Sequence, residues 1–175
     1  AYPGVLGTGV VKMPGLSAGR TGLTEEQAKA AGFDVETVVA VTDDKAHYYP
    51  DAAFFVTKLI AEKSSHRLLG MQVLGPGAVD KMVDIAVTGL NMGAVLEEYD
   101  NGDYAYAPPF STAIHPFVQT VYILENKLSG DFVSLTPADY AAGKADKYRV
   151  IDLSREQAIR GADKVELTAV NGPLE

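Results

Sequence analysis

Residues 53–90 read AFFVTKLIAEKSSHRLLGMQVLGPGAVDKMVDIAVTGL, and this stretch decides the fold. Two apolar runs, 53–61 and 67–74, flank a polar segment of hairpin length, which predicts two antiparallel strands. Both faces of the second run are partly apolar, so we expect it to lie in the centre of a sheet. A Gly-Pro-Gly turn at 75–77 ends the strand pattern, and residues 79–90 place their apolar side chains along one helix face.

Upstream of this stretch, residues 35–41 are short and β-branched, which predicts a third strand. Thr24 followed by Gln27 is typical of a capping box, so we expect a helix that starts there and stops at the glycine at position 32. Val10-Val11 is compatible with a short strand in an otherwise glycine-rich segment.

Downstream, residues 94–99 indicate a short helix, and the prolines in 104–111 exclude regular secondary structure there. Ser111 or Thr112 is then expected to cap a helix that runs to about residue 128. The predicted class is α+β: an antiparallel sheet of three or more strands with helices packed on one face.

The last part of the chain differs in character. Thr136-Pro137 is typical of a helix start, residues 148–153 predict a strand, and Ser154 is expected to cap a helix over 155–160. A strand–helix unit of this size cannot enclose its own core. We therefore expect a domain at 1–130 followed by a partial tail or linker at 131–175.

Composition excludes several classes of function. The 175 residues have a net charge of −8, which argues against nucleic acid as a partner, and they include no apolar run long enough to span a membrane. Cysteine is absent, so disulfides, thiolate catalysis and cysteine-bound metals are excluded, and the three histidines lie too far apart to suggest a metal site. The first residues do not have the pattern of a signal peptide, and we expect a piece of a longer cytoplasmic protein.

The most distinctive residues are tyrosines beside prolines. Tyr48-Tyr49-Pro50 and Tyr106-Ala107-Pro108-Pro109 each place a phenol next to a rigid turn. A fixed backbone holds a side chain in one position, and a phenol can donate a hydrogen bond to a thiolate or an oxyanion without being charged itself. Tyrosine–proline pairs also pack at turns and interfaces, so the residues alone leave both interpretations open.

His115 precedes Pro116 near a predicted helix start, and it is a candidate general acid or base because imidazole titrates near neutrality. One helical turn later, Gln119 and Thr120 occupy the place where a supporting carboxylate would be expected. A structural or exposed histidine is the competing interpretation.

Several motifs together resemble the C-terminal dimerisation domain of flavin-dependent pyridine nucleotide-disulfide oxidoreductases, over about residues 5–130. Within that superfamily the resemblance is greatest to coenzyme A-disulfide reductase and its NADH oxidase and peroxidase relatives. In chain order the motifs are Gly7-Thr8, Thr21-Gly22-Leu23-Thr24-Glu25, Tyr48-Tyr49-Pro50, Leu68-Leu69-Gly70-Met71-Gln72, Val79-Asp80-Lys81 with Asp84, and Tyr106-Ala107-Pro108-Pro109-Phe110-Ser111.

The resemblance implies a homodimer formed through this domain. In such enzymes two tyrosines reach into the partner's active site, near the coenzyme A sulfur and the redox cysteine. By motif these are Tyr106 and one of Tyr48 or Tyr49, with Tyr48 preferred. The resemblance also implies that FAD and NAD(P)H bind to upstream regions of the parent enzyme, so we expect this fragment alone to hold no cofactor and to be inactive. The parent enzyme would be an oxidoreductase that reduces a coenzyme A-type disulfide, persulfide, peroxide or O₂.

Two departures from the family pattern concern the substrate. Met82 stands where the family usually has arginine, and His115-Pro116 stands where Asp-Pro is common. The histidine is similar to that of the glutathione reductase and lipoamide dehydrogenase branch, in which it acts as an acid/base across the dimer. Residues 134–175 resemble the opening of a rhodanese-like domain, through Val150-Ile151-Asp152 and 168–173. The alternative function is a non-catalytic dimerisation or interaction module.

Overall fold

The computed structural model describes residue 2, residues 4–152 and residues 163–164. The chain divides into two compact units, residues 1–133 and residues 134–175. The first unit contains the sheet and both tyrosine motifs. The second unit is treated separately below.

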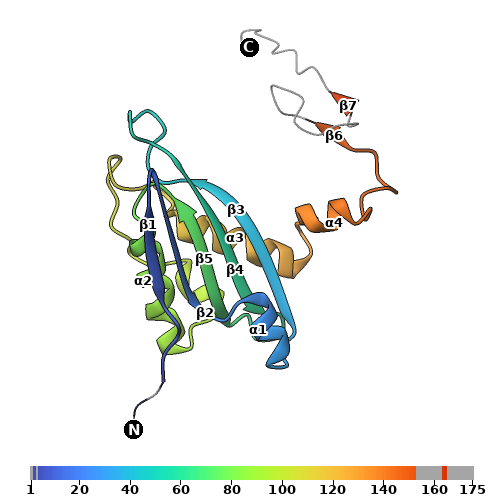
Figure 1. Cartoon of the computed structure of the whole chain (residues 1–175), viewed down its shortest axis with the longest axis horizontal. Helices are drawn as coiled ribbons and strands as arrows, with labels where there is room; N and C mark the ends of the chain where they lie inside the picture. Colours follow the sequence, from blue (N-terminus) through green and yellow to red (C-terminus); the bar gives the residue numbers. More distant parts are fainter. Residues whose placement is uncertain (1, 3, 153–162, 165–175) are drawn as a thin grey trace. The chain divides into compact units, whose positions relative to one another are not determined.

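A five-stranded sheet forms the centre of the first unit (Figure 1). Its strands follow the order β1-β2-β5-β4-β3, and every neighbouring pair is antiparallel. The strands are β1 (Gly9–Met13), β2 (Leu16–Gly22), β3 (Val35–Asp43), β4 (Phe54–Glu62) and β5 (Leu68–Gly75). The predicted α+β class and the central position of β5 are thus confirmed.

The sequence did not predict β2, and a packing requirement explains why. Gly19 lies in the middle of this strand, where a Cβ atom would come within 2.6 Å of a Val83 methyl group and 2.9 Å of a Val79 methyl group. Val79 and Val83 belong to the helix α2 (Val79–Met92), and only glycine lets this helix approach β2 so closely. The strand therefore lacks the alternating apolar side chains by which strands are recognised in a sequence.

Two long helices cover one face of the sheet, and both lie behind it in Figure 1. They are α2 (Val79–Met92) and α3 (Pro116–Ser129). The core lies between these helices and the sheet, and its fully buried side chains include Leu59, Met71, Met82, Phe117 and Leu124. A short 3₁₀ helix, η1 (Leu96–Tyr99), adds Leu96 and Tyr99 to this core, which confirms the short helix expected there.

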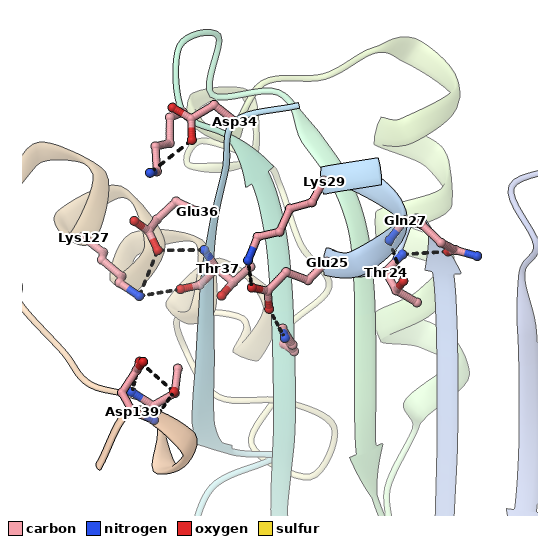
Figure 2. Close-up of polar contacts among 12 residues, drawn as sticks. Thr24, Glu25, Gln27, Lys29, Asp34, Glu36, Thr37, Lys127 and Asp139 are labelled. Carbon is pink, nitrogen blue, oxygen red and sulfur yellow. Dashed lines mark hydrogen bonds and ion pairs between the residues drawn. The ribbon is translucent and has the colours of Figure 1, made fainter. Parts of the chain in front are cut away.

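The short helix α1 (Glu25–Ala30) lies on the opposite face of the sheet, in front of it in Figure 1. Ala28 of this helix packs with Ile60 and Leu69 in a second, smaller cluster. The predicted capping box is present: the Thr24 side chain accepts the Gln27 N–H, and the Gln27 side chain accepts the Thr24 N–H (Figure 2). The prediction that helices pack on one face therefore holds for α2 and α3, whereas α1 covers part of the other face.

Ion pairs attach the outer helices to the sheet. Glu25 of α1 contacts Lys29 at 2.5 Å and Lys58 of β4 at 2.6 Å, and the two hydrogen bonds from these lysines lower the pKa of Glu25 (Figure 2). In the last turn of α3, Lys127 Nζ lies 3.0 Å from a Glu36 carboxylate oxygen and donates to the Thr37 carbonyl oxygen at 2.8 Å. Side chains thus connect α1 to β4 and α3 to β3.

The start of α3 differs from the prediction. The helix begins at Pro116, and its N-cap is His115 rather than Ser111 or Thr112. The proline ring disfavours the helical conformation for the residue that precedes it, so a helix that started at Ser111 would be interrupted at His115. His115 instead has an extended backbone, with φ −55° and ψ 138°, and its ring supplies the cap.

In the second unit, the described residues, 134–152 and 163–164, form short elements. Thr136 caps α4 (Pro137–Ala141), which confirms the helix start expected at Thr136-Pro137, and Asp139 completes a capping box. The strands β6 (Ile151–Asp152) and β7 (Asp163–Lys164) pair in parallel. Of the strand expected over 148–153, residues 151–152 are strand, residues 148–150 are not, and residue 153 lies outside the described residues. The helix expected over 155–160 and the motif at 168–173 lie outside the described residues.

Candidate functional site

The loop between β3 and β4 holds Tyr48 and Tyr49, and hydrogen bonds close its base. The Asp44 N–H donates to the Ala53 carbonyl oxygen at 2.9 Å, and the Ala53 N–H donates to Asp44 Oδ1 at 2.8 Å. Inside the loop, the Tyr49 N–H donates to the Ala46 carbonyl oxygen at 3.0 Å. The backbone around both tyrosines is therefore held at its ends and near its centre.

Three aromatic rings stand together on this loop. The His47 ring meets the Tyr48 ring edge to face, with centroids 5.6 Å apart, and the Tyr48 and Tyr49 centroids are 5.3 Å apart. Tyr48 is 67 % exposed, whereas Tyr49 is half-buried. The more accessible of the two phenols is thus that of Tyr48.

Tyr106 lies on the connection between η1 and α3, which contains neither helix nor strand over residues 101–115, as its prolines predicted. A turn follows the tyrosine, because the Phe110 N–H and the Ser111 N–H both donate to the Ala107 carbonyl oxygen, at 2.8 and 3.2 Å. Tyr106 is 54 % exposed. Its side chain therefore does not belong to the core of this chain.

One hydrogen bond joins the two loops. The Ala46 N–H donates to the Pro108 carbonyl oxygen at 3.3 Å, and in Figure 1 both loops lie at the same end of the sheet. Motifs far apart in the sequence are thus brought side by side. Exposed apolar side chains on or beside the loops are Tyr48, Tyr106, Phe110 and Ile114.

His115 is the last residue before α3, at the end of the connection that carries Tyr106, and it is only 5 % exposed. Its Nδ1 accepts the Phe117 N–H at 3.2 Å, so the neutral ring has its proton on Nε2. Burial, with a smaller effect of the Lys81 charge, lowers the pKa of His115 to about 4. The structure places His115 as a helix cap that is neutral at pH 7, and its role as an acid/base stays a prediction.

Sequence reasoning missed two residues that support these loops. Tyr104 stacks on the His115 ring, with centroids 5.1 Å apart and planes inclined by 26°, and its hydroxyl donates to the Tyr99 carbonyl oxygen at 3.2 Å. Burial raises the pKa of Tyr104. Asp44 has the residue type that is common where a turn begins, and this is the one signal that could have identified it.

A hollow of about 610 Å³ lies on the open face of the sheet, away from both loops. Its lining includes four apolar residues on neighbouring strands, each directly opposite the next across the strand pair: Val11, Ala18, Leu74 and Val56. Val41 continues this row next to Val56, outside the hollow. None of its lining residues belongs to a tyrosine loop, so the tyrosines do not line this hollow.

The described residues do not fit a dinucleotide cofactor or a metal ion. A dinucleotide site of the Rossmann type needs a parallel strand–helix–strand unit with a glycine-rich turn, and the sheet of the first unit is antiparallel throughout. Among residues 2, 4–152 and 163–164, no three histidine or acidic side chains lie where they could hold a metal. The exposed phenols of Tyr48 and Tyr106 can donate hydrogen bonds.

Comparison with known proteins agrees with this geometry. Residues 10–117 match the family described as pyridine nucleotide-disulphide oxidoreductase, dimerisation domain. The chain belongs to this family. A curated member, the NAD(P)H sulfur oxidoreductase (CoA-dependent) of Pyrococcus furiosus, is 35 % identical over 124 residues, which are 71 % of this chain and 28 % of the relative.

Two solved structures are also similar to this chain. A NAD-dependent persulfide reductase from A. fulgidus is 35 % identical, with a TM-score of 0.84, over 94 % of this chain and 30 % of that chain. Reduced CoADR-RHD from Bacillus anthracis is 28 % identical, with a TM-score of 0.86, over the same shares of the two chains. The resemblance to coenzyme A-disulfide reductases stated from sequence motifs is thus confirmed.

The chain spans less than a third of the length of the curated relatives that it matches. No helix within the described residues is long and apolar enough to cross a membrane.

Proposed function

We propose that this dimerisation domain is part of a longer FAD- and NAD(P)H-dependent oxidoreductase that works as a homodimer. The substrate class is a coenzyme A-type disulfide or persulfide, with peroxide or O₂ as the alternative acceptor. The relatives support this class, since they include a CoA-dependent sulfur oxidoreductase, a coenzyme A polysulfide/persulfide reductase, a coenzyme A disulfide reductase and an NADH oxidase.

Within that enzyme, Tyr106 and Tyr48 or Tyr49 contribute in trans to the partner's active site. The observation that supports this role is the hydrogen bond from the Ala46 N–H to the Pro108 carbonyl oxygen, which joins the two tyrosine loops. The exposure of Tyr48 and Tyr106 supports it as well, because a phenol buried in this chain's own core could not reach a neighbouring subunit.

The chemistry of these residues is electrostatic. When a sulfur–sulfur bond is reduced, negative charge develops on the departing sulfur. A phenol O–H held in place can donate a hydrogen bond to that sulfur, which stabilises the developing thiolate without a cost of reorganisation during the step. Bound FAD and NAD(P)H would supply the electrons from other parts of the parent enzyme.

The test is substitution of the phenols in the full-length holoenzyme. We expect Tyr106→Phe and Tyr48→Phe to lower kcat about 10- to 100-fold with bound FAD and dimer mass unchanged, since each removes one donor to developing charge. Tyr140→Phe is the matched control, because Tyr140 is an exposed tyrosine of the second unit. Wild-type turnover by both variants would reject the donor role and favour a non-catalytic dimerisation module.

Mixed dimers test whether the tyrosines act in trans. One subunit would carry Tyr106→Phe and the other a substitution of the parent enzyme's redox cysteine. If Tyr106 serves the partner's site, mixing restores one functional site per mixed dimer. If it serves its own subunit's site, mixing restores nothing.

A further inference from the structure

A buried carboxyl group lies at the base of the Tyr48–Tyr49 loop. Asp44 is the first residue after β3, and its side chain is only 4 % exposed. Its Oδ1 accepts the Ala53 N–H, and its own N–H donates to the Ala53 carbonyl oxygen, so one residue makes both bonds that close the loop. A substitution that removes the Asp44 carboxyl group therefore removes one of the two hydrogen bonds that close the loop.

The second oxygen of Asp44 lies against the turn that leads into α2. A Cβ atom added at Gly77 would lie 2.7 Å from Asp44 Oδ2 and 3.2 Å from the Phe55 ring. The φ angle of Gly77 is not in the left-handed region, so glycine is required here for space rather than for backbone conformation. Any other residue at position 77 would displace the carboxyl group or the ring.

The Lys45–Asp51 ion pair on this loop is more exposed than the Asp44 carboxyl group at the start of the loop. Lys45 Nζ lies 2.6 Å from an oxygen of Asp51, whose side chain is 74 % exposed, and 3.9 Å from Asp44 Oδ2. Exposed ion pairs contribute little to holding a structure, because solvent screens them. The hydrogen bonds of Asp44 and its fit against Gly77 therefore determine the position of the loop base.

We propose that Asp44 is a positioning residue for the tyrosine loops. Its carboxyl group, seated against Gly77, holds the loop that presents Tyr48 and Tyr49. The hydrogen bond from Ala46, two residues further on, extends this hold to the backbone beside Tyr106. The inference rests on the proposed function, because it assigns Asp44 a role that is exerted only through the tyrosines.

The experiment compares four variants of the full-length holoenzyme. Asp44→Ala removes the acceptor, and Gly77→Ala displaces it while the aspartate stays. Asp51→Asn is the control for a carboxylate lost from the same loop. Gly9→Ala is the control for a glycine replaced, because an added Cβ at Gly9 would meet no atom within 4 Å.

Turnover would be measured with NADH or NADPH and whichever of CoA disulfide, CoA persulfide or O₂ the wild-type enzyme reduces fastest. We expect kcat to fall about 10-fold or more in Asp44→Ala and Gly77→Ala, because small displacements of an oriented donor have large effects on rate. FAD content and dimer mass should stay unchanged, and the two controls should stay within about 2-fold of wild type.

Combined variants distinguish positioning from general support of the fold. In a Tyr48→Phe/Tyr49→Phe/Tyr106→Phe background the phenols of both loops are already absent, so Asp44→Ala should lower kcat little further. An equal fall in both backgrounds would overturn the proposal, because Asp44 would then act independently of the tyrosines. Amide hydrogen exchange adds a direct readout: exchange within 46–53 should speed about 10-fold in Asp44→Ala and Gly77→Ala.

The results distinguish the positioning role of Asp44 from the proposed function of the tyrosines. If the tyrosine variants are slow while Asp44→Ala and Gly77→Ala turn over like wild type, only the positioning role is rejected. If the tyrosine variants themselves turn over like wild type, the proposed function fails, and the positioning role is rejected with it.

Discussion

The ring of His115 stacks on the ring of Tyr104, with their centroids 5.1 Å apart. The same imidazole accepts the Phe117 N–H through Nδ1 and so caps α3. One side chain therefore connects the start of a core helix to the segment that immediately precedes Tyr106. This relationship makes the stability of the domain depend on the state of a single histidine.

Replacing His115 should weaken α3 at its start. We expect His115→Ala to lower the free energy of unfolding by about 2–3 kcal/mol, of which the lost cap is about 1 kcal/mol and the lost packing the rest. His115→Asn keeps a side-chain acceptor at the N-cap and should recover about 1 kcal/mol. Urea unfolding of this chain at pH 7.5 measures both, and equal losses in the two variants would contradict the capping role.

The lowered pKa of His115 predicts acid sensitivity. Well above pH 6.5 the ring is neutral in both the folded and unfolded chain, so it adds no pH dependence there. Between pH 6.5 and about 4 the unfolded chain takes up a proton on this ring that the folded chain does not, so stability falls. The difference in free energy of unfolding between wild type and His115→Asn, measured from pH 7.5 to pH 4, isolates this contribution. If that difference stays constant over this pH range, the prediction is contradicted.

Glu125 of α3 should have the opposite pH dependence. Burial, followed by the nearby Asp100 and Glu97 charges, raises its pKa to about 7. A raised pKa stabilises the fold fully below about pH 4.5, and this contribution is lost as the pH rises through 7. We expect Glu125→Gln to stabilise the chain at pH 8 by no more than about 1 kcal/mol after solvent screening, and to change little at pH 4.5.

Thermal unfolding of Glu125→Gln at pH 4.5, 6 and 8 would measure this effect. Glu26→Gln is the control, because Glu26 is an exposed acid in the first turn of α1. A Glu125→Gln stabilisation that is equal at all three pH values would indicate a packing effect and contradict the titration.

Gly89 and Tyr99 form a tight contact between α2 and η1. A Cβ atom at position 89 would lie 1.7 Å from Tyr99 Oη, and this buried hydroxyl has no hydrogen-bond partner among the residues that the structure describes. Gly89→Ala should therefore destabilise the chain by about 1–3 kcal/mol through overpacking, despite the better helix propensity of alanine. Tyr99→Phe removes an unpartnered polar group and should change stability by less than about 1 kcal/mol.

The pair of substitutions should be non-additive. In the Tyr99→Phe background the nearest clashing atom is gone, so Gly89→Ala should cost about 1 kcal/mol less than it does in the wild-type chain. A double-mutant cycle from urea unfolding measures the coupling. Strict additivity would show that the contact between Gly89 and the Tyr99 hydroxyl is not what limits the space.

Where the sequence predicted structure correctly, the determining interactions are local. The Thr24–Gln27 capping box, the β3–β4–β5 strand patterns and the apolar face of α2 each follow from residues close to one another in the chain. The start of α3 was predicted wrongly because Ser111 and Thr112 are good cap residues by type, whereas the restriction imposed by Pro116 places the cap at His115.

By itself the sequence determined the α+β class, the central strand, the family and the presence of tyrosines beside rigid prolines, because periodicity, caps and motifs are properties of neighbouring residues. Only the tertiary structure decided that β2 completes the sheet, that Asp44 seats against Gly77 and that Ala46 binds Pro108. Each of these depends on how closely distant segments approach one another, and the packing of the whole sheet against its helices sets that distance.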